Sequence, residues 1–265
     1  MAGKFGIDIS HWQGDFDFAK AKEEGVEFVI IKCGGADRVL YKDDKFERNY
    51  KAAKEQGLGV GAYFFGYAST VEQAKIEANY CMSLLKGKQF DYPIFYDAEA
   101  EVMNKGKTAL TDIISAFCDY AEANGYWCGF YTNLDWYYNK LHGATLAQRY
   151  SLWLATWSKN MPDVKGIQMW QYGGEINYIR SNKVAGVVCD QNYCFVDYPS
   201  LIKARNLNGY KKQAVASKPK KSVDEIAQEV IQGKWGAGAE RKKKLAAAGF
   251  DYSAVQAKVN ELMRK

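Results

Sequence analysis

The chain has 265 residues, of which 48% are hydrophobic, so it is long enough for one large domain and a second, small one. No run approaches the roughly 20 apolar residues of a membrane span, which excludes a helical membrane protein. The net charge is +5, but residues 211–265 carry 13 Lys/Arg against 6 Asp/Glu while residues 1–210 carry a net −2. This basic tail favours a polyanionic partner, and nucleic acid, an anionic membrane and bacterial wall polymers all qualify.

Short apolar runs alternate with amphipathic stretches through most of the chain. Eight runs are predicted strands, at residues 5–9, 28–32, 60–65, 93–97, 128–131, 152–155, 167–171 and 186–189. Amphipathic helices are expected between the first five, for example at 44–56, 70–85 and 108–124, each ended by a glycine: Gly57, Gly87 and Gly125. Residues 157–165 and 173–185 predict loops or hairpins. Eight strands with long helices only in the first part predict an incomplete α/β barrel.

A domain boundary is predicted near residue 210. The predicted parts are a barrel over residues 1–208, a charged, flexible linker over 209–221 and a three-helix module over 222–265. Ser222 and Glu225 form a capping box for the first helix, a second helix is expected at 239–248, and Ser253 with Gln256 is expected to begin the third. The inner faces are predicted to carry Val223, Ile226, Ala227, Val230 and Ile231 on the first helix, and Val255, Val259 and Leu262 on the third.

The cysteines and histidines indicate no metal site. Six cysteines occur without any C-x-x-C pair, and His11 and His142 are the only two histidines, so neither a zinc site nor another metal or cofactor is expected. The cysteines are predicted to be buried free thiols in a reduced cytosol. Because the first residues lead into a predicted strand without an apolar signal segment, synthesis in the cytoplasm is expected.

Two carboxylates lie at the end of the fourth predicted strand. Asp97 and Glu99 stand two positions apart, so on an extended backbone they face the same way, roughly 6.6 Å apart at Cα. In a barrel they would point into the carboxyl-terminal mouth, where such folds place their sites. Glycoside hydrolysis needs such a pair, one group as proton donor and one as a stabilising charge, and mutual repulsion would raise one pKa. Solvated surface pairs with this spacing are common, so the pair alone is weak evidence.

Two further aspartates strengthen this interpretation. Asp8 ends the first predicted strand and Asp190 ends the eighth, and these strands are neighbours once a barrel closes. All these carboxyl groups would then converge on one rim. Burying them is costly without a function, and the surrounding positions are rich in aromatic residues: Trp12, Tyr63, Phe65, Tyr96 and Trp170.

The segments around these residues resemble a known family. They are Asp-Ile-Ser-His-Trp-Gln at residues 8–13, Gly-Ala-Tyr-Phe-Phe at 61–65, Tyr-Asp-Ala-Glu at 96–99, Gly-Phe-Tyr-Thr-Asn at 129–133 and Met-Trp-Gln-Tyr at 169–172. Over about residues 3–205 the chain resembles the family 25 glycoside hydrolases, the Chalaropsis-type lysozymes. The resemblance implies an irregular TIM-like α/β barrel of five β/α units and three further strands. It also implies N-acetylmuramidase activity, which cuts the β-1,4 bond between N-acetylmuramic acid and N-acetylglucosamine of peptidoglycan with retention.

The resemblance also implies residue roles. Glu99 would be the general acid and base, and Asp97 would orient or charge-stabilise the substrate's 2-acetamido group if that group, rather than a carboxylate, is the nucleophile. Asp8 and Asp190 would bind sugar and tune Glu99. His11 is expected to make only a structural hydrogen bond. The candidate sugar contacts, with core packing as the alternative for the aromatic ones, are Tyr63, Phe65, Tyr96, Tyr131, Trp170 and Gln171.

The tail resembles a second known unit. Residues 224–260 are similar to the CW-seven type of cell-wall-binding repeat, which recurs in phage lysins and implies muropeptide recognition. Trp235 and Arg241 are the candidate ligand contacts, although Trp235 would equally well fill the small bundle. Because the chain has one copy, we expect weak affinity unless the protein forms a homo-oligomer through this module.

These features together predict a phage or prophage endolysin that a holin releases to the wall, with an exported bacterial autolysin as the alternative. The expected partner is bacterial peptidoglycan. A non-catalytic sugar-binding protein would keep the aromatic rim but would not need the four carboxyl groups. A nucleic-acid-binding protein would use the basic tail, but the aromatic-interleaved basic motif of a known nucleic-acid module is missing from the sequence, and no membrane insertion is expected.

Overall fold

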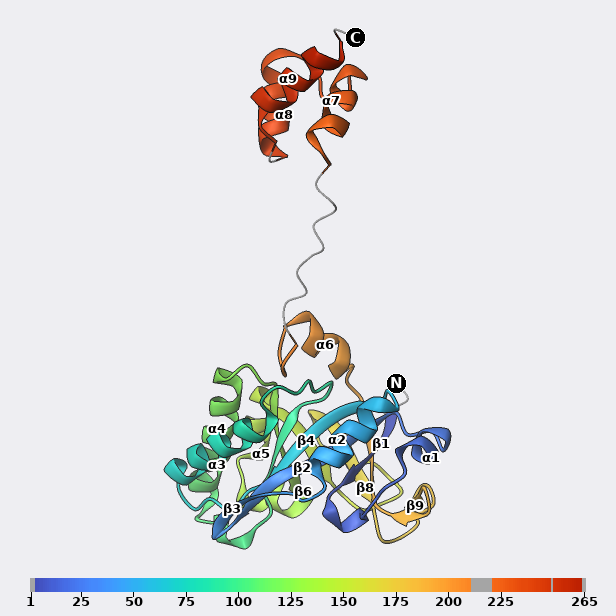
Figure 1. Cartoon of the computed structure of the whole chain (residues 1–265). Coiled ribbons are helices and arrows are strands. Elements are labelled where there is room, and N and C mark those ends of the chain that lie inside the picture. Colours follow the sequence, from blue (N-terminus) through green and yellow to red (C-terminus); the bar gives the residue numbers. More distant parts are fainter. Residues whose placement is uncertain (1–2, 211–220, 249, 264–265) are drawn as a thin grey trace. The chain divides into compact units, whose positions relative to one another are not determined.

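The computed structural model describes residues 3–210, 221–248 and 250–263. The chain divides into two compact units, Met1–Lys212 and Gln213–Lys265 (Figure 1), each with its own hydrophobic core. The boundary lies close to the predicted one. Most of the predicted linker at 209–221 lies outside the described residues.

The first unit is a closed barrel of eight strands. They are β1 (Lys4–Ile9), β2 (Phe28–Asp37), β4 (Gly59–Phe65), β5 (Ile94–Asp97), β6 (Cys128–Asn133), β7 (Ser151–Ala155), β8 (Ile167–Gly173) and β11 (Asp190–Cys194). A pairing between β1 and β2 closes the barrel. Neighbouring strands are parallel, except that β11 runs antiparallel to both β8 and β1. The predicted α/β barrel is therefore confirmed.

Five helices follow the first five barrel strands: α1 (Phe18–Glu23), α2 (Phe46–Glu55), α3 (Val71–Leu85), α4 (Lys107–Ala123) and α5 (Gly143–Arg149). Short helical turns η1 (His11–Gln13), η2 (Glu101–Met103) and η3 (Trp136–Lys140) lie between them, and α6 (Tyr198–Ala204) follows β11. Gly57, Gly87 and Gly125 have φ of 70°, 80° and 82° just after α2, α3 and α4. Only glycine adopts this backbone without strain, so these three residues end the helices as predicted.

The prediction of the eighth strand is wrong in position. Residues 186–189 lie in a small hairpin of β9 (Lys183–Val184) and β10 (Val187–Val188), and the barrel strand β11 begins at Asp190. Asp190 therefore begins a strand instead of ending one. Because β11 is antiparallel to β1, its first residue lies at the rim where β1 ends, and Asp8 is paired directly with Asp190. The carboxyl groups of Asp8 and Asp190 therefore meet at one rim as predicted, but they do so because β11 is antiparallel to β1.

Strand β2 is longer than the predicted 28–32. It extends beyond the barrel rim to Asp37 and turns at Arg38 into β3 (Val39–Lys42), forming a hairpin. The hairpin lies at the end of the barrel where the parallel strands finish (Figure 1).

The inside of the barrel is filled by large apolar side chains. Phe28, Tyr92 and Phe95 pack there around Trp153, and Tyr198 of α6 joins them at the amino-terminal end. Trp153 meets Tyr131 edge-on, with ring centroids 4.7 Å apart. A larger core lies between the barrel and its helices. The interior is thus a packed floor beneath the carboxyl-terminal mouth.

The second unit consists of α7 (Val223–Ile231), α8 (Gly238–Ala247) and α9 (Tyr252–Leu262). The Ser222–Glu225 capping box is present. The predicted third cap is wrong, because Asp251 accepts from the Ser253 backbone and begins α9. Val223 and Ile231 are exposed, contrary to prediction, whereas the buried faces carry Ile226, Ala227, Val230, Val255 and Val259, with Leu262 partly buried against them.

All six cysteines are free and buried, as predicted. Within the described parts of the chain, no helix is both long enough and apolar enough to cross a bilayer.

Candidate active site

The four predicted carboxyl groups meet at the carboxyl-terminal mouth of the barrel. Asp8 of β1 lies opposite Asp190 of β11, while Asp97 is the last residue of β5 and Glu99 follows it by two positions. The charge of Glu99 raises the pKa of each of the three aspartates, which requires all four groups to lie within electrostatic reach of one another. Asp8 and Asp97 are buried, and Glu99 is exposed.

These surroundings favour the protonated forms of the carboxyl groups. Burial raises the pKa of Asp8 to about 6 and of Asp190 to about 8, and it raises the pKa of Asp97 well above its usual value. The pKa of Glu99 is also raised, since the walls of the mouth partly desolvate it even though its side chain reaches solvent. The mouth can therefore hold a proton near neutral pH, as a general acid must.

The raised pKa values predict that the barrel loses stability as the pH rises. Asp8 and Asp190 bind protons more tightly in the folded chain than at their ordinary pKa of 3.8. Their stabilisation is complete below that value and is lost as the pH passes about 6 and then about 8. We expect Tm, measured by thermal unfolding, to fall from about pH 5 to pH 9. The fall in Tm should be smaller in Asp190→Asn than in the wild type. The same dependence of Tm on pH in both proteins would contradict the raised pKa of Asp190.

A network of side-chain amides holds Asp8. Gln171 Nε2 and Asn192 Nδ2 both donate to Asp8 Oδ2, at 3.1 and 2.7 Å. The amide orientations follow from the other contacts: Asn192 Oδ1 accepts from the Trp153 indole (2.8 Å), and Gln171 Oε1 accepts from Tyr131 Oη at 3.0 Å. Because both NH₂ groups face Asp8, they stabilise its ionised form and oppose the effect of burial.

Asp97 has an unused hydrogen-bond acceptor. Its Oδ1 atom is buried and has no hydrogen-bond partner among the described residues. A buried carboxyl oxygen without a partner costs free energy unless a ligand satisfies it. At the mouth of the barrel, this atom can accept a hydrogen bond from a bound substrate.

Lys32 is a site residue that the sequence analysis missed. Its Nζ atom lies 4.8 Å from the centroid of the Phe65 ring and 5.9 Å from that of Tyr63, and its charge lowers the pKa of both Asp97 and Glu99. Lys32 is the single charged residue in the otherwise apolar segment 28–33. A lone charge in a predicted buried strand could have indicated a site residue.

Trp157 and Gly174 were also missed, and no periodic pattern marks either of them. The Trp157 indole donates to Gln171 Oε1 at 3.1 Å. Gly174 lies against Asp190: a Cβ atom on Gly174 would lie 1.8 Å from Asp190 Oδ1 and 3.4 Å from the Trp157 ring. The absence of a side chain at residue 174 thus makes room for the Asp190 carboxyl group.

Gly174→Ala is therefore expected to displace Asp190 and to lower the catalytic rate about tenfold or more, because misplaced catalytic groups lose rate steeply. The rate of reducing-end release from peptidoglycan measures the effect. In an Asp190→Ala background the same substitution should cost almost nothing, since the clash is gone. Fully additive losses in the double variant would show that Gly174 acts elsewhere.

Three of the predicted sugar contacts lie at the mouth. Tyr63 and Phe65 of β4 and Tyr131 of β6 are half-buried. The rings of Tyr63 and Phe65 lie near Lys32 Nζ, and Tyr131 is the neighbour of Asp97 on the adjacent strand. Burial, together with the charges of Asp8 and Asp97, raises the pKa of the Tyr63 hydroxyl, which lies close to these carboxyl groups. Gln171 is buried and holds Asp8, so it acts behind the sugar-contacting surface.

Two other predicted contacts are wrong. Tyr96 is fully buried on the outer face of the barrel, where it stacks on Phe117 (4.0 Å between centroids) and donates to Glu77 at 2.6 Å. Trp170 is buried in the outer core, and its indole donates to the Thr156 carbonyl. Alternation along a strand turns both away from the mouth that Asp97 and Gln171 face.

Trp12 is not buried among the carboxyl groups as expected, because its side chain is 80% exposed just beyond β1. His11 has the structural role predicted for it: its Nδ1 atom lies 2.8 Å from the buried Asp43 carboxylate.

The two candidate ligand contacts of the second unit are half-buried and already hydrogen-bonded. Trp235 packs against the bundle core, and its indole donates to Glu229 at 3.1 Å. Arg241 Nε donates to the Gly236 carbonyl at 2.9 Å, and its guanidinium also donates to Gln256. Their role in binding stays a prediction.

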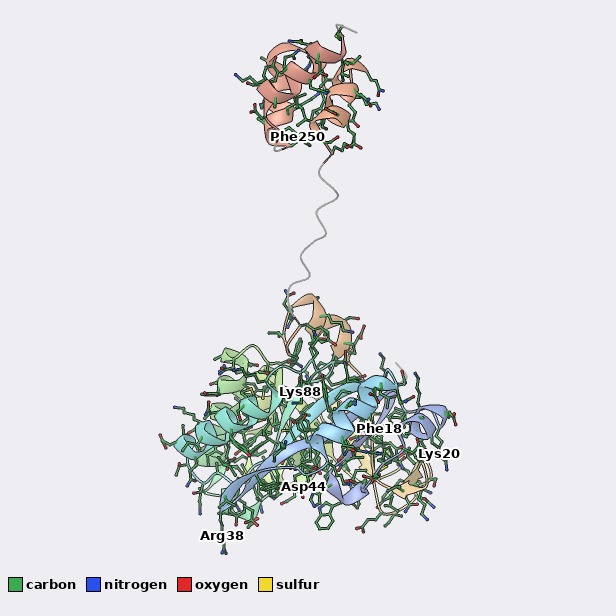
Figure 2. The ribbon with its side chains drawn as sticks, viewed as in Figure 1. Phe18, Lys20, Arg38, Asp44, Lys88 and Phe250 are labelled. Carbon is green, nitrogen blue, oxygen red and sulfur yellow. The ribbon has the colours of Figure 1, made fainter. Side chains whose placement is uncertain are left out.

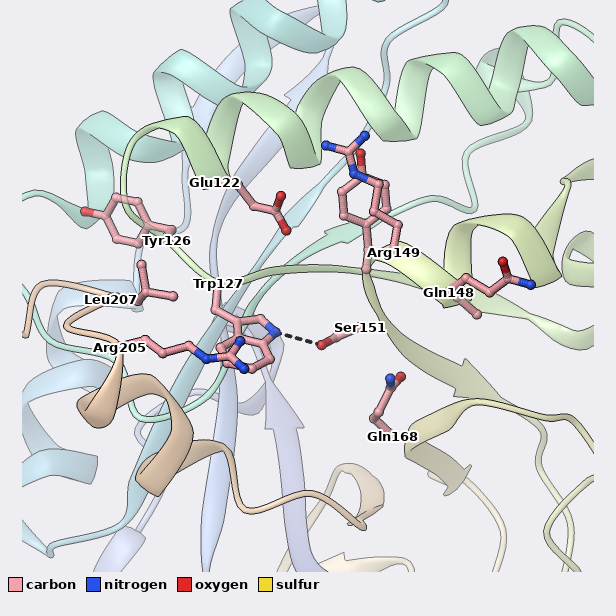
Figure 3. A pocket seen from close by; sticks show the side chains of 11 residues that line it. Glu122, Tyr126, Trp127, Gln148, Arg149, Ser151, Gln168, Arg205 and Leu207 are labelled. Atoms are coloured by element: carbon pink, nitrogen blue, oxygen red, sulfur yellow. Dashed lines mark hydrogen bonds between the residues drawn. The ribbon is translucent and has the colours of Figure 1, made fainter.

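A separate cavity of about 330 Å³ opens at the amino-terminal ends of β6, β7 and β8 (Figure 3). Trp127 donates to Ser151 there at 3.0 Å, and the Arg205 guanidinium lies over the Trp127 ring. This cavity contains none of the predicted catalytic residues.

In the described ranges, no group of three or more His, Cys, Asp or Glu side chains is arranged to hold a metal ion.

Each of the two units matches a known family model. The family model "Glycosyl hydrolases family 25" matches residues 7–179, and the CW_7 repeat model matches residues 224–263. Lysozyme M1 of Streptomyces globisporus is 29% identical over 201 residues, 71% of this chain and 66% of the relative. The lysozyme of Streptococcus phage Cp-7 is 28% identical over 269 residues, 97% of this chain and 69% of the relative.

Among solved structures, the bacterial lysozyme from Streptomyces coelicolor matches with a TM-score of 0.63 at 26% identity, covering 78% of this chain and 98% of that one. The chain spans about half to two thirds of the length of the first relatives in sequence.

Proposed function

The chain belongs to the glycosyl hydrolases of family 25, and from this premise we propose that it is an N-acetylmuramidase. It cuts the β-1,4 bond between N-acetylmuramic acid and N-acetylglucosamine in bacterial peptidoglycan. The observation that carries the proposal is the cluster of Asp8, Asp97, Glu99 and Asp190 at one barrel mouth, in which Glu99 is the one carboxyl group of the four that is exposed to solvent. A proton donor must reach the glycosidic oxygen, and Glu99 can do so.

Glu99 acts first as acid and then as base. Partial desolvation raises its pKa above the usual value and so favours the protonated carboxyl group, which gives its proton to the leaving sugar oxygen as the C1–O bond breaks. The carbonyl oxygen of the substrate's 2-acetamido group bonds to C1 from the opposite face. Glu99 then takes a proton from water, whose oxygen bonds to C1 and reopens the acetamido ring, so the configuration is retained.

Asp97 orients the acetamido group in this scheme. The free Oδ1 atom of Asp97 supports the assignment, because a buried acceptor at this place suits the acetamido N–H. Asp8 supplies negative charge close by, since two amide donors stabilise its ionised form. Tyr63, Phe65 and Tyr131 provide the surfaces for sugar rings.

Product analysis tests this function. Purified protein is incubated with bacterial sacculi, and the fragments are reduced and identified by mass spectrometry. Muropeptides that end in reduced muramic acid are expected. Reduced glucosamine ends, free stem peptides, or wall binding without any cleavage would each overturn the proposal, the last in favour of a sugar-binding protein.

The second unit serves as a wall-binding module joined by the segment at 209–221. The match of residues 224–263 to the CW_7 repeat supports this role, as does the charge of the tail, which suits an anionic wall. Trp235 and Arg241 remain the candidate contacts for the muropeptide. One copy gives weak binding, so self-association through this module would strengthen attachment to the wall.

We place the protein among phage or prophage endolysins, with release through a holin, in preference to exported autolysins. This placement is supported by the lysozyme of phage Cp-7, because its similarity covers 97% of the present chain and includes the tail. Expression in a host with and without a co-expressed holin tests the route: lysis is expected only with the holin.

A further inference from the structure

A groove of about 270 Å³ lies near the carboxyl-terminal ends of β2 and β4. It is formed by the β2–β3 hairpin, the segment after β4, the first turns of α3 and the turn η2. Its lining comprises Ala36, Arg38, Val39, Leu40, Tyr67, Ser69, Gln73, Ile76, Glu77 and Val102. Its volume is just below that of typical ligand pockets, which suits a short segment of a larger molecule.

The chemistry of the groove is aliphatic with one positive charge. Val39 and Ile76 are 69% and 59% exposed, and Leu40 and Val102 add further apolar surface. Arg38 lies at the tip of the hairpin (Figure 2) with a φ of +60°, and no carboxylate of the described residues lies within salt-bridge distance of it. Residues other than glycine adopt this backbone at a free-energy cost. An exposed, unpaired guanidinium favours a ligand carboxylate.

The floor of the groove is a buried carboxyl group. Glu77 accepts from Tyr96 Oη at 2.6 Å and from the Tyr67 backbone N–H at 3.2 Å. Burial raises its pKa to about 7, so at neutral pH it only partly opposes an anionic ligand.

Several residues of the groove follow closely in the chain after residues of the catalytic mouth. Tyr67 stands two residues beyond Phe65, at most about 7 Å along the chain. Val102 stands three residues beyond Glu99. On the hairpin, Tyr41 packs over Gly35, and its ring centroid lies 5.6 Å from Lys32 Nζ. The distance from the mouth to the groove is therefore about the length of two extended residues, so a peptide substituent on a sugar bound at the mouth can reach it.

We propose that this groove binds the stem peptide of the peptidoglycan strand whose muramic acid occupies the mouth. The inference rests on the proposed muramidase function. Stem peptides are short, rich in alanine and carry free carboxylates, so their methyl groups match Val39, Leu40 and Ile76, and a carboxylate matches Arg38. A further sugar ring fits less well, because rings favour aromatic faces and the groove presents mainly aliphatic side chains.

Two forms of one substrate test the proposal. Sacculi are used either intact or after an amidase has removed the stem peptides from the lactyl groups, and kcat/KM for reducing-end release is measured on both. Wild-type protein is expected to prefer the intact form. Arg38→Glu should lower kcat/KM on the intact form by about tenfold, the effect of losing one charge-assisted contact. Ile76→Asp should also lower it, because it places a carboxylate where the methyl groups of the stem peptide pack. Neither should change cleavage of the stripped form.

Arg205→Glu is the matched control, since Arg205 is an exposed arginine beside the cavity at the opposite end of the barrel. It should leave both rates unchanged, and Arg38→Lys should restore most of the intact-substrate rate. Equal rates of wild type on the two forms, or losses in Arg38→Glu that are the same on both, would overturn the stem-peptide groove. Such results would leave the muramidase function standing, whereas a wild type that releases no muramic ends from either form would overturn that function itself.

Discussion

Replacing Glu99 by glutamine is expected to stop muropeptide release almost completely while the protein still folds and still adsorbs to walls. Glutamine has nearly the same shape but cannot give up or take back a proton, and general acid–base groups contribute about 10²–10⁴-fold to rate. Because the Glu99 side chain has no hydrogen-bond partner among the described residues and its pKa is raised in the folded chain, its loss should not lower Tm.

The measurement is the rate at which reducing ends appear in digested sacculi, with thermal unfolding and wall sedimentation as parallel readings. Glu101→Gln is the control, since Glu101 is an exposed carboxylate two residues further on, paired with Lys140 and outside the carboxyl cluster. Should Glu99→Gln retain wild-type turnover, the assignment of the acid is wrong.

Asp97→Asn is expected to lower activity by about 10²–10³-fold and yet to make the protein more stable. The loss of rate follows because an asparagine amide can turn its NH₂ group toward the substrate, so that the acceptor that orients the acetamido N–H is weakened or lost. The gain in stability follows because burial, Glu99 and Asp8 all raise the pKa of Asp97, so its ionised form is unfavourable in the folded chain at neutral pH. A gain on the order of 1 kcal/mol would raise Tm by about 2–4 °C.

Asp91→Asn provides the opposite case for comparison. Asp91 is equally buried but lies 2.8 Å from Lys54 Nζ and 3.3 Å from Lys203 Nζ, and its pKa is lowered. This variant should lose stability and keep its activity. A destabilised Asp97→Asn protein, or one with normal turnover, would contradict the view that Asp97 is a strained functional group.

Neighbouring residues in the sequence were enough to predict part of the site. Asp97 and Glu99 could be recognised from their spacing at the end of an apolar run, and Asp8 from its place at the end of the first run. The same alternation should have excluded Tyr96 and Trp170, which stand one residue from Asp97 and Gln171 and so face the outer core. Aromatic character alone was a poor guide, because it marks core positions as often as binding surfaces.

The sequence by itself determined seven of the eight barrel strands, the glycine-ended helices, the separate helical module and two adjacent carboxylates, because these depend on side-chain periodicity and backbone preference within a few residues. Only the tertiary structure decided that Asp190 reaches the mouth from the start of an antiparallel strand, that Gly174 makes room for it, and that Gln171 and Asn192 hold Asp8. These contacts join residues up to 184 positions apart. Strand direction and long-range hydrogen bonds depend on which segments pair, and no local pattern carries that information.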